Sequence, residues 1–221
     1  ERLEVSQSKE MLGLMGRPDG IDSDEAGHLL SKTTAWAKSL CEFKIKPSDS
    51  WYSLTITVTR TVEYPLMATT LTRKELDTIM APVIKHGLRS SSIQRNMPKA
   101  LVYGPIDMQG LNIHHPFYTQ LIQHLLAILR HGTRKTISGH LLRSGMEQLT
   151  LELGTGTPFW QLSPDPWASI MTPCWLKSTW VDLSSTNLSL EGPITKLELL
   201  RDGDSFLTDC FIQAGYREGD L

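Results

Sequence analysis

The clearest element of this chain is a helix, which is predicted by the stretch from residue 23 to residue 43, SDEAGHLLSKTTAWAKSLCEF. Its apolar positions recur every three or four residues, which is the spacing of one buried helical face. Asp22 or Ser23 is placed to cap the first turn, and Pro47 lies beyond the end. The apolar face consists of Ala26, Leu29, Leu30, Thr33, Trp36, Ala37, Leu40 and Phe43.

Before this helix, the sequence predicts a short strand and a turn. The apolar run at residues 11–15, MLGLM, is typical of a short strand. Residues 17–20 then read Arg-Pro-Asp-Gly. Proline presets φ for a turn and glycine adopts the unusual φ that a turn requires, so we expect the chain to reverse here.

After the helix, residues 51–62 give conflicting signals. The run Leu54-Thr55-Ile56-Thr57-Val58 alternates like a half-buried strand. Leu54 and Val58 also fit one helical face together with Trp51 and Val62. Local propensity alone favours a strand slightly.

The next helix has a clear start at residues 72–75, Thr-Arg-Lys-Glu. This is a capping box, in which the Thr72 hydroxyl and the Glu75 carboxylate each accept the other residue's backbone amide. We expect Pro82 to kink the helix and Gly87 to provide its left-handed C-terminal residue. The buried stripe is predicted to consist of Leu76, Ile79, Met80 and Val83.

The sequence after residue 87 predicts a stretch of turns, then two helices and a loop. Residues 88–113 are expected to be mostly turn and short extended chain. Helices are predicted from Pro116 to the residues before Gly132 and from Ile137 to Leu153. Residues 154–173 are rich in Gly and Pro, so they suggest a linker or surface loop and a domain boundary.

Two further helices are predicted after that loop. The first would bury Trp175, Leu176, Trp180 and Leu183. The second would be capped by Asp204, end at Gly215, and turn Phe206, Leu207, Cys210 and Phe211 inward. The fold class expected from the sequence is therefore mainly α.

Charge is segregated along the chain, although the net charge is only −2. Residues 78–146 carry eight Lys or Arg against one acid, Asp107, whereas residues 147–221 carry four basic and eleven acidic groups, a net −7. Six of the seven histidines also lie in the basic stretch. A basic segment of this kind favours contact with a polyanion, and nucleic acid is the first candidate.

Several other functions receive little support. The chain lacks an Asp-Asp pair, Cys-x-x-Cys, His-Glu-x-x-His, Gly-x-Ser-x-Gly and a Walker loop. His114 and His115 are adjacent and would point apart on a strand, so a surface histidine beside a half-buried one is favoured over a metal site.

No run approaches the ~18–20 apolar residues that cross a bilayer, so no membrane is expected. Three widely separated cysteines favour reduced thiols in an intracellular compartment, cytoplasmic or nuclear.

Several short sequence motifs, taken in their order along the chain, resemble those of a known family. Met11-Leu12-Gly13-Leu14, the helix around Trp36 and Val62-Glu63-Tyr64-Pro65-Leu66 resemble the segment just after the polymerase core of reverse transcriptases of the non-LTR-retrotransposon type. Later words resemble the C-terminal region of the same open reading frames. They are Asn96-Met97-Pro98, Tyr103-Gly104-Pro105, Gln109-Gly110-Leu111, Leu129-Arg130-His131-Gly132, Trp175-Leu176-Lys177 with Trp180, and Ala214-Gly215-Tyr216-Arg217.

The resemblance implies an organisation for the whole chain. Residues 1–21 would end the primer-grip strand, with Leu12 and Gly13 as the primer-grip-like pair. Residues 22–87 would form a helical thumb, which makes 51–62 a helix against local propensity. A basic helical segment, 88–153, would follow, then the 154–173 loop and an acidic helical segment, 174–221. The aromatic-x-Asp-Asp box is absent, so catalysis and its Mg would belong to an upstream polymerase core of the same polypeptide.

Two functions remain open on these grounds. The first is a noncatalytic part of an RNA-directed DNA polymerase that grips the RNA/DNA template–primer duplex, with no cofactor of its own. The alternative is a helical protein-interaction module, for which Trp160 and Trp167 would suit an interface anchor. In the first hypothesis the phosphates are contacted by Lys85, Arg89, Arg95, Lys99, Arg130, Arg134, Lys135 and Arg143.

Overall fold

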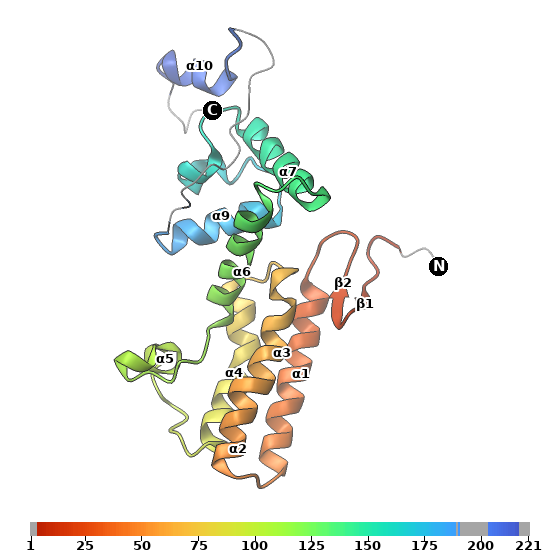
Figure 1. Cartoon of the computed structure of the whole chain (residues 1–221), viewed down its shortest axis with the longest axis vertical. Helices are drawn as coiled ribbons and strands as arrows, with labels where there is room; N and C mark the ends of the chain where they lie inside the picture. The colour runs from red at the N-terminus through yellow and green to blue at the C-terminus, as the bar shows by residue number, and fades with distance from the viewer. Residues whose placement is uncertain (1–3, 189, 191–202, 217–221) are drawn as a thin grey trace. The chain divides into compact units, whose positions relative to one another are not determined.

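The computed structural model describes residues 4–188, 190 and 203–216. Its elements are nearly all helical, with one short two-stranded sheet near the N-terminus, so the mainly α prediction is confirmed (Figure 1). The chain divides into two units, residues 1–120 and 121–221. Each unit has its own core, and each is described separately below.

The first unit begins with a β-hairpin formed by β1 (Lys9–Met11) and β2 (Leu14–Gly16). The strand expected over 11–15 is therefore wrong, because the chain reverses in the middle of that run. Leu12 and Gly13 form the turn, with φ of 54° and 84°. The fully buried carboxylate of Glu25 accepts the Met15 amide at 2.6 Å, which fastens the hairpin to the first helix.

Helix α1 (Ser23–Glu42) follows the predicted turn at residues 17–20, which is closed by a hydrogen bond from the Gly20 amide to the Arg17 carbonyl. The predicted stripe is buried at Leu29, Thr33, Ala37 and Leu40. Two details differ from expectation. Phe43 lies past the helix end with its side chain exposed. The Asp22 carboxylate accepts the Thr70 amide at 2.6 Å and makes no cap.

Residues 47–67 are helical throughout, which confirms the helix inferred from the family resemblance over the strand that propensity favours. Their elements are α2 (Pro47–Tyr52), the π-helix η1 (Ser53–Val58), α3 (Thr59–Glu63) and the 3₁₀-helix η2 (Tyr64–Met67). In the π-helix region, the Thr59 hydroxyl donates to the carbonyl of Leu54, five residues earlier, at 2.6 Å. Threonine side chains can take part in such local hydrogen bonds, and burial of Leu54, Val58 and Val62 overrides strand propensity.

Helix α4 (Arg73–Ser90) starts with the predicted capping box, because both Thr72–Glu75 hydrogen bonds are present. The helix continues through Pro82 and ends three residues beyond Gly87, so the prediction that Gly87 ends it is wrong. Gly87 is buried inside the helix, where an added Cβ would lie 2.9 Å from Leu54 Cδ1 and 3.2 Å from the Trp36 ring. The lack of a side chain at Gly87 allows α4 to approach η1 and α1 closely.

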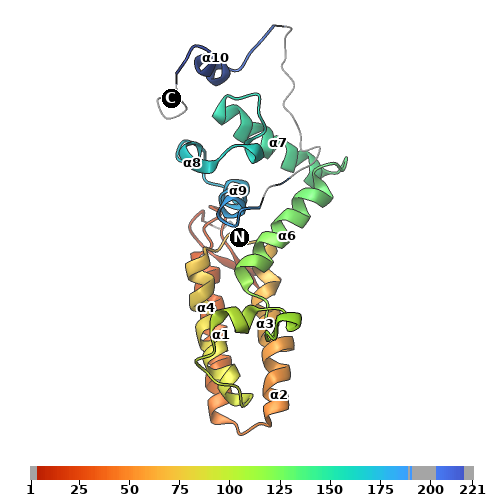
Figure 2. The same ribbon diagram turned by 90° about the vertical axis from the view of Figure 1, so that its left-hand side faces the viewer.

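These helices form the core of the first unit. Helix α1, the α2–η1–α3 segment and α4 lie side by side in both views (Figures 1 and 2). Short helices α5 (Lys99–Tyr103) and η3 (Ile106–Met108) follow, so the extended chain expected here is helical in part. Among the fully buried side chains are Leu54, Leu66, Leu76 and Leu88.

The division between the units falls inside α6 (Pro116–His131), which joins α7 (Ile137–Leu153) through a short turn. Both helices agree with the prediction, and Gly154 ends α7 with a φ of 66°. Helix α9 (Trp175–Ser185) also agrees, with Leu176, Trp180 and Leu183 buried.

Residues 154–173, expected to be a linker or surface loop, contribute to the core of the second unit. They contain the 3₁₀-helix η4 (Phe159–Gln161) and α8 (Pro164–Trp167). Trp160 is 7% exposed and Trp167 is 3% exposed, so neither tryptophan is free to anchor a partner. This removes one argument for the interaction module.

Helix α10 (Leu207–Gln213) is shorter than expected, and Phe206 takes the cap position in place of Asp204. The side chains expected to turn inward lie differently: Leu207, Cys210 and Phe211 are exposed. Gly215 follows the helix with a φ of 93°, as predicted. The predicted acidic segment 174–221 also includes residues that lie outside the described part of the chain.

Candidate nucleic-acid interface

Four of the predicted cations lie around the turn that connects α6 and α7 in the second unit. Arg130 is in the last turn of α6, Arg134 and Lys135 are in the turn itself, and Arg143 is on α7. The first three side chains are exposed, and within the described ranges no carboxylate forms an ion pair with them. They form one basic surface, which we call the α6–α7 basic turn and define as Arg130, Arg134 and Lys135.

Arg143 has a different role from the other three. Its guanidinium Nη1 donates to the carbonyls of Gly132 and Arg134, at 3.1 and 2.9 Å, and Nη2 lies 3.0 Å from Nδ1 of His140. The side chain is only partly exposed. Because its donors are directed at the backbone of the turn, Arg143 is a positioning residue that holds the basic turn against α7.

The other four predicted cations belong to the first unit. Lys85 and Arg89 lie four residues apart on α4, which places them on the same face of that helix. Arg95 follows in the loop after α4. All three are exposed, and no ion pair involves them in the part of the chain that is described. They could meet an anion without first breaking a contact.

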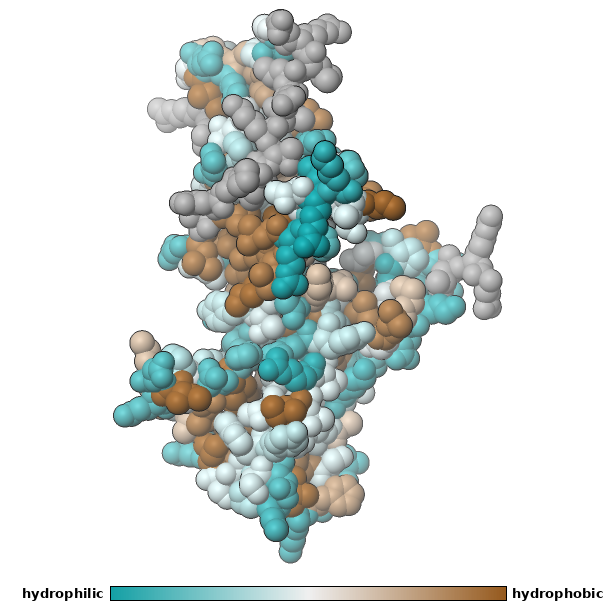
Figure 3. All heavy atoms as spheres, in the orientation of Figure 1, coloured by the Kyte–Doolittle hydropathy of each residue, from teal (hydrophilic) through white to brown (hydrophobic). Residues whose placement is uncertain are grey.

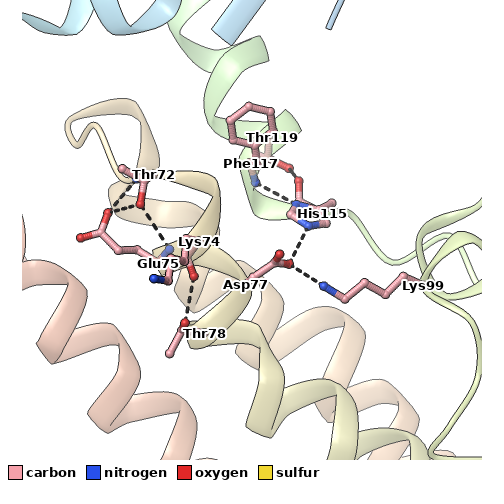
Figure 4. A network of polar contacts seen from close by, with 9 residues as sticks. All are labelled: Thr72, Lys74, Glu75, Asp77, Thr78, Lys99, His115, Phe117 and Thr119. Carbon is pink, nitrogen blue, oxygen red and sulfur yellow. Dashed lines mark hydrogen bonds and ion pairs between the residues drawn. The ribbon is translucent and has the colours of Figure 1, made fainter. Parts of the chain in front are cut away.

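Lys99, the fourth cation of this group, is already paired. Its ammonium group lies 3.0 Å from Oδ1 of Asp77 on α4 (Figure 4). The same oxygen lies 3.2 Å from Nε2 of His115. Burial would raise the pKa of Asp77, but the hydrogen bonds and charges of Lys99 and His115 outweigh it and lower that pKa. Lys99 is therefore the least available of the four for a phosphate.

His115 is the centre of this network and was missed as such by sequence reasoning. Its Nδ1 accepts the Phe117 amide at 3.2 Å, so the ring proton lies on Nε2, which donates to Asp77. Burial lowers the pKa of His115, against the opposing effect of Asp77. Both ring nitrogens are engaged, so this histidine fixes the start of α6 on α4 and leaves no free nitrogen for general-base chemistry.

Tyr103 and His114 are neighbours of the Asp77–His115 pair. The Tyr103 ring packs against the His115 ring, with centroids 4.5 Å apart and planes inclined by 60°. Burial together with the Asp77 charge raises the pKa of Tyr103 to about 12. His114 is exposed and lies 3.3 Å from the Glu63 carboxylate, so the two adjacent histidines have separate partners. Across the described ranges, no group of three or more His, Cys, Asp or Glu side chains is arranged to hold a metal ion.

Leu12 and Gly13, the primer-grip-like pair, form the tip of the hairpin. Leu12 is 91% exposed, and its carbonyl accepts the Tyr64 hydroxyl at 3.0 Å. The positive φ of both residues produces the tight reversal. The tip is thus an exposed apolar point whose backbone is held by the first unit.

The comparisons with known proteins add no relative. No protein-family model, no curated protein and no solved structure matches this chain. Within the described part of the molecule, none of the helices combines the length and apolar character needed to cross a bilayer.

Proposed function

We propose that this chain is a noncatalytic part of a retroelement RNA-directed DNA polymerase, and that it holds the template–primer duplex through its phosphates. The observation that carries the proposal is the α6–α7 basic turn. Its three cations are exposed and free of carboxylate partners in the described structure, on a turn that Arg143 fixes. A fixed surface of unpaired cations suits sequence-independent phosphate contact.

The first unit adds a second set of available cations. Lys85, Arg89 and Arg95 are exposed and have no ion pair in the described residues, so six of the eight predicted cations are available for phosphates. If four of these six contact phosphates, the affinity should fall with salt with a log–log slope of roughly −3 to −4. Lys99 and Arg143 would contribute indirectly, because their donors are already engaged.

The arrangement of the first unit is compatible with the family that the sequence resembles. A short hairpin is followed by helices that lie side by side, as expected for the end of a primer-grip strand and a helical thumb. In this proposal the magnesium ions and the catalytic carboxylates belong to the upstream polymerase core. The residues of this chain bind and orient the duplex and do not react with it.

A charge-reversal variant tests the proposal. Arg130→Glu, Arg134→Glu and Lys135→Glu together should abolish binding to an RNA–DNA hybrid, measured by fluorescence anisotropy at low salt. A control variant reverses the charges of Lys44 and Lys46, which are exposed and lie outside both predicted sets, between α1 and α2. Binding that survives the triple reversal, in a chain with an unchanged circular dichroism spectrum, would contradict the proposal.

A second candidate, a helical protein-interaction module, is favoured by one observation. Ile137 and Leu141 lie one turn apart on α7, directly after the basic turn, and are 81% and 69% exposed. Apolar surface is also exposed on the face shown in Figure 3. If the folded chain fails to bind a hybrid even at low salt, this candidate replaces the first one.

A further inference from the structure

Two helices of the first unit bring a cysteine and a histidine together. Cys41 lies in the last turn of α1, and His86 lies on α4, 45 positions later in the sequence. The Cys41 Sγ is 3.1 Å from Nδ1 of His86. When the imidazole carries its own proton on Nε2, Nδ1 accepts the thiol proton, so the pair has the arrangement of a thiol beside a base.

The surroundings of this pair are mostly basic. On α4, Lys85 is next to His86, and Arg89 is one turn further on the same face. On α1, Lys38 lies one turn before Cys41 and is paired with Glu42 at 3.7 Å. Lys38, Lys85 and Arg89 are positively charged and Glu42 is negatively charged, so an acidic reagent meets more positive than negative charge at this pair.

The other two cysteines differ from Cys41 in their exposure or in their hydrogen-bond partners. Cys174 is only partly exposed, and Cys210 is exposed with the Ser205 hydroxyl 3.0 Å from its sulfur. Neither has an imidazole at hydrogen-bond distance in the described structure. Cys41 therefore combines exposure with a base, whereas Cys210 provides an exposed cysteine without one.

We propose that Cys41 is a site of reversible modification by small acidic disulfides, of which glutathione disulfide is the test case. His86 accepts the thiol proton, and the Cys41 sulfur attacks one sulfur of the disulfide. A new S–S bond forms to Cys41 as the old one breaks, and the second sulfur leaves with the electron pair and takes the proton from His86. One disulfide replaces another, so the incoming disulfide is the oxidant and no further reagent is needed.

The modification would also change the proposed nucleic-acid surface, and this consequence rests on the proposed function. A glutathionyl group brings two carboxylates and one ammonium group next to Lys85 and Arg89. Loss of one phosphate contact costs roughly five- to tenfold in affinity near 0.1 M salt. The adduct should therefore weaken hybrid binding by about that factor.

The test uses the full chain under native conditions. The protein is incubated with glutathione disulfide, quenched with acid and digested, and each cysteine's adduct is quantified over time by mass spectrometry. Cys41 should react at least about tenfold faster than Cys210 in the same molecule. Equal rates at the two exposed cysteines would overturn the proposal. This measurement requires no nucleic acid and no variant.

A variant assigns the role of the imidazole. His86→Gln should reduce the Cys41 rate to that of Cys210 and leave Cys210 itself unchanged, which serves as the control within the molecule. A Cys41 rate that is unaffected in this variant would show that His86 is not the base. Hybrid affinity of the modified chain is measured separately, so failure of the proposed function and failure of the exchange site give different results.

Discussion

Arg143→Met should destabilise the second unit, although Arg143 is one of the eight cations predicted from the sequence to bind phosphate. The substitution removes hydrogen bonds of 3.1 and 2.9 Å to the carbonyls of Gly132 and Arg134. Hydrogen bonds from a charged group contribute about 1.5–3 kcal/mol each, but water can replace the lost donors at this turn. The methionine that replaces Arg143 is not held in one rotamer, which recovers up to about 2 kcal/mol of side-chain entropy. We expect a net loss of about 1–2 kcal/mol in unfolding free energy.

Urea unfolding followed by tryptophan fluorescence measures this loss, because four of the six tryptophans belong to the second unit. With a urea dependence of about 2 kcal/mol/M, the midpoint should fall by about 0.5–1 M. The control is Arg134→Met, since the Arg134 side chain makes no hydrogen bond among the described residues and only its carbonyl is used. That variant should stay within about 0.5 kcal/mol of the parent.

The same pair of variants separates positioning from phosphate contact. In hybrid binding, Arg134→Met should reduce the magnitude of the salt slope by about one, whereas Arg143→Met should leave the slope unchanged under conditions where it is folded. Equal stability of the two methionine variants would refute the assignment of Arg143 as a positioning residue.

Three further predictions concern stability. Thr72→Ala removes the hydroxyl of the capping box and should cost about 1 kcal/mol, measured by chemical unfolding; no loss would contradict the cap. Gly27→Ala, on an open face of α1, should raise the unfolding free energy by up to about 1 kcal/mol. Gly87→Ala should lower it by about 1 kcal/mol or more, because the added Cβ would lie 2.9 Å from Leu54 Cδ1. Equal effects of the two substitutions would refute the close packing at Gly87. Burial raises the pKa of Asp182 to about 6, so ionisation of this carboxyl opposes folding. The penalty is largest above that pH, shrinks as the pH falls, and is lost only below 3.8, the ordinary pKa of aspartate. Asp182→Asn should therefore gain about 1 kcal/mol of unfolding free energy at pH 7, because partial solvent access reduces the effect of the full shift, and less at pH 5; an equal gain at both values would contradict the assignment.

The helices could be predicted where local signals and burial agree. The capping box at Thr72 and Glu75 marks the start of α4, and Pro116 and Gly132 mark the ends of α6. Leu12 shows where local reasoning fails. Leucine rarely adopts a positive φ, so local reasoning predicts one strand over the apolar run around Leu12, whereas the chain reverses at that residue.

Other differences arise from packing across the fold. Gly87 is a helix-ending residue by local preference, but its lack of a side chain is used for contact with Leu54, which no local signal records. The availability of the cations is also a tertiary property. Lys99 is paired with a carboxylate 22 residues away, and Arg143 is directed at carbonyls 9 and 11 residues away, so a count of charges along the sequence overstates the free positive surface.

The most direct test of the central claim is the binding of a labelled RNA–DNA hybrid by the full chain across a salt series, followed by fluorescence anisotropy. The α6–α7 basic turn and the free cations of α4 predict tight binding at low salt, with a log–log slope of roughly −3 to −4. Absence of binding at low salt, by a chain that circular dichroism shows to be folded, would contradict the claim that this protein grips a template–primer duplex.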